Sequence, residues 1–168
     1  MNPPSEADLA RVGARLGKAL RARKWHLATA ESSTGGLIGH AITMTAGASD
    51  YYAGGVIGYS NHAKEAALGV PHDLIEANGA VSEEVAAALA EGAAQRFEAE
   101  VGVSVTGVAG PDGGSERKPI GTHYVGVALR DEPPRVEHHV FGHDRNGNRA
   151  AAAMAALELA LDEVSAAG

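Results

Sequence analysis

The chain has 168 residues, enough for one domain with a substantial core but too few for two. Its formal charge is −7 and its longest basic run is Arg21-Ala22-Arg23-Lys24, so nucleic acid is not an expected partner. The lack of cysteine excludes disulfides, thiolate chemistry and a cysteine-based zinc site. Because there is neither a membrane-spanning apolar run nor a signal peptide pattern, we expect no membrane association and a single cytoplasmic domain over residues 1–168.

The first half of the chain alternates helix and strand patterns. Ser5 and Asp8 predict the capping box of a first helix. Its apolar face has helical spacing: Leu9, Val12, Leu16 and Leu20. A strand is predicted over 25–30, a helix over about 34–44 and a strand over 52–59. Asn61 is the expected cap of a short helix ending near Gly69, and Asn78-Gly79 ends another.

The second half continues this alternation. Ser82-Glu83-Glu84 opens a long helix with Val85, Leu89 and Phe97 on one side, and a strand with alternating valines follows over 101–105. Two strands are predicted over 122–129 and 136–141, joined by a turn at 131–134. A last helix is expected from about Arg149, and its buried positions are Met154, Leu157, Leu161 and Val164. Such alternation favours a single three-layer α/β/α domain with a mixed sheet.

The most informative segment runs from Glu31 to Gly36, between the first strand and the second helix, and we call it the hydroxyl corner. It contains Ser32, Ser33 and Thr34, followed by two glycines. A strand that ends this way before a helix presents free N–H groups and the positive end of the helix dipole. The corner could hold an anion or carry a serine nucleophile beside an oxyanion hole. A simple helix cap with a tight turn would have the same sequence.

Three further segments place chemically capable residues at strand ends. Tyr59 ends a strand, and Lys64 lies in the first turn of a helix, where the dipole lowers a lysine's pKa. A tyrosine packed in a strand and a solvated surface lysine are the simpler interpretations of these two residues. Five glycines within residues 106–121 suit backbone approach to a phosphate or sugar, although a long flexible loop would look the same. Arg145 and Arg149 could bind a phosphate or form surface ion pairs.

His138, His139 and His143 suggest a metal site at first sight. Adjacent strand residues point to opposite faces of a sheet, and no carboxylate–histidine spacing completes a ligand set. We therefore expect neither a metal nor a cofactor.

Taken in order, these segments resemble the C-terminal domain of the CinA proteins, a family whose members include stand-alone nicotinamide-nucleotide amidases. The similarity covers about residues 5–163. The matching segments are Thr29–Gly36, Gly54–Val56, Tyr59–Lys64, Leu68–Val70, Gly79–Glu83, Thr106–Pro111, Lys118–Gly121 and Asp144–Arg145. The family usually has cysteine at the position of Ser33, so an essential thiol is not expected here. We expect no upstream domain, and hence not the activity of the larger CinA proteins.

The resemblance implies hydrolysis of nicotinamide mononucleotide to nicotinic acid mononucleotide and ammonia. It makes Ser32 the nucleophile and Lys64 the base, with Tyr59 relaying or orienting the proton. The expected substrate-binding residues include backbone donors of the hydroxyl corner and groups for the nucleotide: Glu31, Ser33, Thr34, Gly35, Gly36, Thr106, Gly107, Gly110, Arg145 and Arg149. Glu31 could orient the corner, hold Lys64, or make only a structural hydrogen bond.

A small-molecule nucleotide is the expected partner, and the protein is expected to be a homo-oligomer, a dimer or higher. Two other functions stay open. One is a nucleotide-binding module without turnover. The other is a Ser–Lys amidase or esterase that acts on another nucleotide or small amide.

Overall fold

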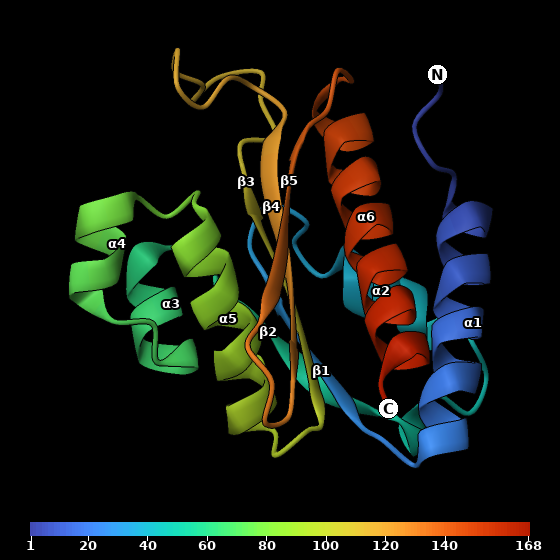
Figure 1. Cartoon of the computed structure of the whole chain (residues 1–168). Helices are drawn as coiled ribbons and strands as arrows, with labels where there is room; N and C mark the ends of the chain where they lie inside the picture. The colour runs from blue at the N-terminus through green and yellow to red at the C-terminus, as the bar shows by residue number, and fades with distance from the viewer.

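The computed structural model describes residues 1–168 and has three layers, with helices on both faces of a central sheet (Figure 1). The sheet has five strands in the order β2-β1-β3-β4-β5. Their bounds are β1 Leu27–Glu31, β2 Tyr52–Ile57, β3 Val101–Gly107, β4 Thr122–Leu129 and β5 Arg135–Val140. β1 pairs in parallel with β2 and β3, whereas β4 pairs antiparallel with β3 and β5. The predicted three-layer α/β/α fold with a mixed sheet is confirmed.

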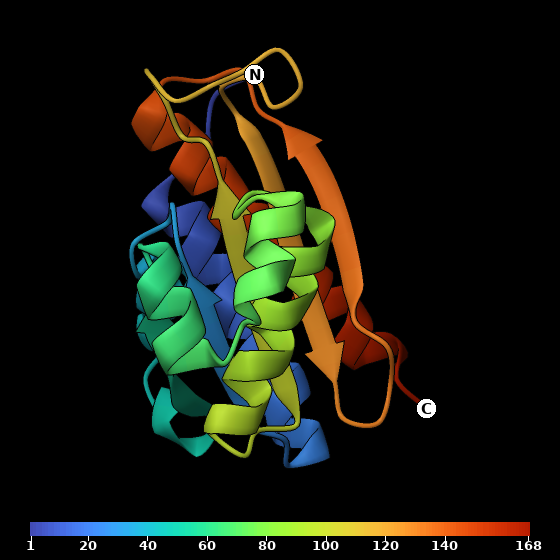
Figure 2. The same cartoon turned by 90° about the vertical axis from the view of Figure 1, so that its left-hand side faces the viewer.

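Two groups of helices cover the sheet. α1 (Glu6–Arg23), α2 (Leu37–Thr43) and α6 (Arg145–Ala166) pack on one face. α3 (Asn61–Leu68), α4 (His72–Asn78) and α5 (Glu83–Arg96) lie on the other, as the turned view in Figure 2 also shows. A short 3₁₀ helix, η1 (Ala48–Asp50), precedes β2. None of the helices has the length and apolar character needed to cross a bilayer.

Strand β3 is buried on both faces, although its alternating sequence predicts only one apolar face. Its three valines join the larger core, which includes residues of α1, α2 and α6. On the other face, the Ser104 hydroxyl donates to the Ala86 carbonyl oxygen at 2.6 Å. A Cβ at Gly102 would lie 1.9 Å from the Ala90 carbonyl oxygen. The small residues of β3 are therefore not solvent-facing; they allow α5 to approach the sheet closely.

Three helices begin at residues other than those predicted, because of glycine conformation at α2 and side-chain capping at α3 and α6. The expected start of α2 is too early, because Gly35 and Gly36 have φ values of 60° and 103°, which glycine adopts most readily. Ser60, not Asn61, caps α3, since its hydroxyl accepts a hydrogen bond from the Ala63 N–H at 3.0 Å. Asp144 caps α6 in the same way, at 2.8 Å from the Gly147 nitrogen, so α6 begins four residues before Arg149. On α6, Leu157 and Val164 are buried, while Met154 and Leu161 are only partly buried.

The topology brings the candidate segments together at one end of the sheet. The hydroxyl corner follows β1, the segment with Tyr59 and Lys64 follows β2, and the glycine-rich loop follows β3. The start of α6 lies at the same end, where the glycine-rich loop extends beyond the sheet (Figure 1). The carboxyl ends of parallel strands are where ligands bind in open α/β sheets.

Candidate active site

Ser32 and Lys64 form a buried pair at this end of the sheet. Ser32 follows β1 directly, and its N–H donates to the Val105 carbonyl oxygen at 3.1 Å, which fixes the corner against β3. The Lys64 Nζ lies 3.1 Å from the Ser32 Oγ. Only 2% of the Lys64 surface is exposed, so the interpretation of this residue as a solvated lysine is wrong.

The surroundings of Lys64 favour a neutral amine. Burial lowers its pKa below the ordinary value of a lysine, and no carboxylate pairs with it to offset this. Its Nζ also donates to the carbonyl oxygens of Gly58 at 2.8 Å and Tyr59 at 3.3 Å. A neutral amine has two N–H groups and one lone pair. With both N–H groups on carbonyls, the lone pair is left to accept the proton of Ser32.

The hydroxyl corner presents backbone donors beside Ser32. The Gly35 N–H donates to the Ser32 carbonyl oxygen at 3.1 Å and closes the turn. The N–H groups of Ser33, Thr34 and Gly36 donate to no protein acceptor. Such uncommitted donors next to a nucleophile are the usual material of an oxyanion hole.

The Glu31 carboxylate joins the hydroxyl corner to the first turn of α2. One carboxylate oxygen accepts from the Thr34 hydroxyl at 2.7 Å and the Ile38 N–H at 2.9 Å. The other accepts from the Gly39 N–H at 3.0 Å. Glu31 is buried, makes no contact with Lys64 and does not line the cavity. Of its three suggested functions, orienting the corner and the start of α2 fits these contacts.

A cavity of about 300 Å³ opens beside the Ser32–Lys64 pair. Eight of the sequence-predicted site residues line it: Ser32, Ser33, Tyr59, Lys64, Thr106, Gly107, Gly110 and Arg145. Five do not: Glu31, Thr34, Gly35, Gly36 and Arg149. The Thr106 hydroxyl donates to the Ala80 carbonyl oxygen at 2.8 Å, so it joins two walls of the cavity.

The two arginines have different positions. Arg145 lines the cavity and donates to the Gly110 carbonyl oxygen at 2.7 Å and to the Tyr59 hydroxyl at 3.1 Å. Arg149 donates to the carbonyl oxygens of Ser33 and Thr34, both at 3.0 Å, and so holds the hydroxyl corner from outside the cavity. Tyr59 is 60% exposed; its hydroxyl accepts a hydrogen bond from Arg145, while its backbone oxygen accepts one from Lys64.

Sequence reasoning missed His123, a fully buried residue of β4. Its Nε2 lies 3.0 Å from the Ser33 Oγ, and its Nδ1 lies 3.0 Å from the Gly121 carbonyl oxygen. It also missed Asn148, whose Nδ2 donates to the Ala109 carbonyl oxygen at 3.0 Å and fixes the glycine-rich loop. No local pattern identifies either residue, because each acts on a segment far away in the sequence.

The histidines of β5 make local contacts. His138 stacks on Tyr124, and the His139 Nε2 lies 3.1 Å from a Glu137 carboxylate oxygen. The structure contains no group of three or more histidine, aspartate or glutamate side chains placed to hold a metal ion.

A three-layer α/β domain with a buried serine–lysine pair at the carboxyl ends of its parallel strands has the arrangement of a hydrolase site. The family described as the CinA C-terminal domain matches residues 9–164, and the chain belongs to this family. A CinA-like protein of Salinibacter ruber is 51% identical over 143 residues, which are 85% of this chain and 34% of that protein. The chain thus spans about a third of the length of several curated relatives that it matches.

One relative is similar along its whole length. The nicotinamide-nucleotide amidohydrolase PncC of Enterobacter agglomerans is 44% identical over 159 residues, which are 95% of this chain and 97% of that protein. Among solved structures, a competence/damage-inducible protein of Agrobacterium tumefaciens has a TM-score of 0.89 at 34% identity, covering 96% of this chain and 99% of its own. A protein of Klebsiella pneumoniae described as competence damage-inducible protein A has a TM-score of 0.91 at 29% identity, covering 95% and 99%.

Proposed function

We propose that this chain is an amidohydrolase that converts nicotinamide mononucleotide and water into nicotinic acid mononucleotide and ammonia. The observation that carries the proposal is the hydrogen bond between the buried Lys64 amine and the Ser32 hydroxyl in the cavity wall. The full-length similarity to a nicotinamide-nucleotide amidohydrolase supports the choice of substrate.

In the proposed mechanism, the Ser32 Oγ attacks the carboxamide carbon and its proton passes to the Lys64 Nζ. The negative oxygen of the tetrahedral intermediate accepts a hydrogen bond from the uncommitted N–H of Ser33, the residue after the nucleophile, which lines the cavity. The intermediate collapses as Lys64 returns the proton to the leaving nitrogen, and ammonia departs. Water then cleaves the acyl-Ser32 ester with Lys64 as base.

The remaining residues bind or position. Arg145 is the proposed phosphate ligand, because it is the only arginine or lysine other than Lys64 that lines the cavity. Tyr59 holds Arg145 through its hydroxyl and helps to orient Lys64 through its backbone oxygen. Gly107 and Gly110 line the cavity, and their missing side chains make room for His123 and Ile120, which pack directly behind them. Arg149 and Glu31 keep the hydroxyl corner in shape from outside.

The test is ammonia release from nicotinamide mononucleotide, measured beside nicotinamide, the riboside and the dinucleotide. The proposal expects the mononucleotide to be the best substrate. No ammonia from any of them would favour a nucleotide-binding module without turnover. Faster release from a different amide would favour another Ser–Lys amidase.

Activity should survive EDTA, because each proposed step uses only Ser32, Lys64 and backbone donors. Complete loss of activity with EDTA and its recovery with zinc would contradict the mechanism.

That the protein is a homo-oligomer stays a prediction, which the mass in solution from light scattering would test.

A further inference from the structure

Ser33 lies beside the proposed nucleophile, lines the same cavity and contacts a different base. Its Oγ is 3.0 Å from the His123 Nε2, and Lys64 makes no hydrogen bond to either residue. The proposed amide hydrolysis uses neither the Ser33 hydroxyl nor His123. The cavity therefore contains a second serine–base pair whose chemistry is unassigned.

The hydrogen bonds of His123 define its tautomer. The Gly121 carbonyl oxygen, 3.0 Å from Nδ1, can only accept, so Nδ1 carries the hydrogen. Nε2 then has a free lone pair and accepts the hydroxyl hydrogen of Ser33. Burial of the ring lowers the pKa of His123, which favours the neutral imidazole with its Nε2 lone pair free to accept a proton. The Ser33 hydroxyl, the His123 ring and the Gly121 carbonyl oxygen are thus joined by successive hydrogen bonds, in the order nucleophile, base and orienting acceptor that serine hydrolases use.

Backbone groups complete the arrangement. In chymotrypsin-like serine hydrolases the nucleophile's own N–H is one of the donors that stabilise the oxyanion. The Ser33 N–H has no protein acceptor, and Ser33 lines the cavity. Arg149 fixes the turn by donating to the Ser33 and Thr34 carbonyl oxygens. We propose that Ser33 and His123 form a second nucleophile–base pair, which hydrolyses small activated carboxylic esters independently of Ser32 and Lys64.

The choice of ester follows from what surrounds His123. Its ring hydrogen-bonds to a backbone carbonyl instead of a carboxylate, and its aromatic neighbour Phe141 lies 5.6 Å away between ring centroids. The nearby titratable His139 also disfavours a positive charge on His123. The imidazolium formed during attack is therefore weakly stabilised. Such a pair suits a leaving group that departs as a stable anion, such as a phenolate, and not the amine of an amide.

The proposed ester hydrolysis has an acylation step and a deacylation step. The Ser33 Oγ bonds to the ester carbonyl carbon while its proton moves to the His123 Nε2. The carbon–oxygen bond to the leaving group then breaks, the leaving group departs as its anion, and Nε2 gives its proton to water or to that anion. Water attacks the acyl-Ser33 by the same route and releases the carboxylic acid, so that ester and water give acid and alcohol.

The experiment uses p-nitrophenyl acetate and the full chain carrying Ser32→Ala, which removes the neighbouring nucleophile. This variant should still release p-nitrophenolate, and mass spectrometry of quenched reactions should find the acetyl group on Ser33. Adding Ser33→Ala should lower the rate at least about a hundredfold, because nucleophile and base act as a unit. Adding His123→Gln should do the same, because glutamine can accept the hydrogen bond but cannot take the proton. Ser104→Ala, which also removes a buried serine hydroxyl but lies away from the cavity, should change nothing.

Equal rates with and without Ser33 in the Ser32→Ala protein would overturn the proposal, as would acetylation of Lys64 alone. Should His123→Gln unfold, as judged by circular dichroism, the Ser33→Ala comparison still decides. The outcome is independent of the amidase proposal, since no step in this assay needs a nucleotide, Ser32 or Lys64.

Discussion

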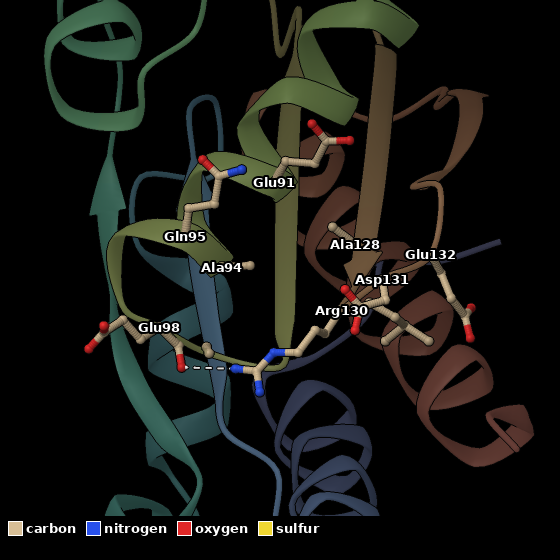
Figure 3. A pocket seen from close by; sticks show the side chains of 10 residues that line it. Glu91, Ala94, Gln95, Glu98, Ala128, Arg130, Asp131 and Glu132 are labelled. Atoms are coloured by element: carbon tan, nitrogen blue, oxygen red, sulfur yellow. Dashed lines mark hydrogen bonds between the residues drawn. The ribbon is translucent and has the colours of Figure 1, made fainter.

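The two ends of the sheet differ in what they bury. At the carboxyl ends of the parallel strands, a cavity of about 300 Å³ contains the buried Lys64 amine. At the opposite end, between α5 and the turn after β4, a larger pocket of about 510 Å³ is lined by exposed charged side chains (Figure 3). Size alone would rank the cavity beside Lys64 below this larger pocket as a candidate site. Chemistry reverses that choice, because removing a charged group from water changes its acidity, whereas an exposed group keeps its hydration.

Backbone direction explains this difference. At the carboxyl end, the turns after β1 and β2 lead into the starts of α2 and α3, and their N–H groups and hydroxyls converge on one space. At the other end, Arg130 extends across the pocket toward the end of α5 (Figure 3). It lies 3.5 Å from the Glu98 carbonyl oxygen and 3.5 Å from a Glu100 carboxylate oxygen. Surface pairs of this kind contribute little to stability.

The largest expected effect comes from the nucleophile. Ser32→Ala should lower ammonia release from nicotinamide mononucleotide by on the order of a thousandfold or more, because the covalent step is lost. Ser33→Ala is the matched control for this reaction and should cost far less, since Ser33 contacts His123 and not Lys64. If Ser33 were essential and Ser32 dispensable for amide hydrolysis, the assignment of the two serines would be reversed.

The second effect tests the buried amine. Lys64→Arg and Lys64→Met should each lower turnover by about a hundredfold or more, because neither side chain can accept a proton at neutral pH. In the unmodified protein, turnover should rise with pH as Lys64 loses its proton. Because burial lowers the pKa of Lys64, the midpoint of this rise should lie below 10.5. A Lys64→Arg protein with near-normal turnover would contradict the assignment of the base.

Lys64→Met also separates stability from activity. Burial lowers the folded-state pKa of Lys64, so the unfolded chain binds this proton more tightly than the folded protein does. The free energy of unfolding should therefore increase with pH between the folded and unfolded pKa values. At neutral pH the buried amine has lost its hydration, and this desolvation lowers the free energy of unfolding. Lys64→Met removes that penalty and should raise the melting temperature by about 2–4 °C for each kcal/mol gained in the free energy of unfolding. A melting temperature that falls would show that the lysine's three hydrogen bonds outweigh its desolvation.

The third effect concerns substrate binding. Arg145→Ala should raise KM for the mononucleotide about tenfold or more, because a hydrogen bond to a charged group contributes about 1.5–3 kcal/mol. The riboside, which lacks the phosphate, should be nearly unaffected. Arg149→Ala should instead lower kcat for both substrates, since this arginine holds the Ser33 and Thr34 carbonyls. Higher salt should weaken binding of the mononucleotide to the unmodified protein but not to Arg145→Ala. An equal loss with both substrates would contradict the phosphate assignment.

The sequence indicates the hydroxyl corner because a strand, hydroxyls, glycines and a helix follow one another directly. It indicates the α/β/α fold for the same reason, since helix and strand periods alternate along the chain. The burial of Lys64 could not be predicted, because it depends on how α3 packs against α5 and β2. His123 was missed because its contact with Ser33 joins residues 90 positions apart. Asp144 was missed as a cap because Asn146-Gly147 does not favour a helix, and tertiary contacts override that preference.

The smallest effect completes the comparison between the two ends. Arg130→Ala removes the cation of the larger pocket, where the Arg130 side chain is 55% exposed. The free energy of unfolding should change by no more than about 0.5 kcal/mol, because exposed charges are already solvated and their pairing is screened. Ammonia release should stay within about twofold of the unmodified protein, since surface changes away from a site rarely alter it. A large loss of activity with the fold intact would mean that the end of the sheet with exposed charges also acts on the substrate, and burial would then be no guide to function in this molecule.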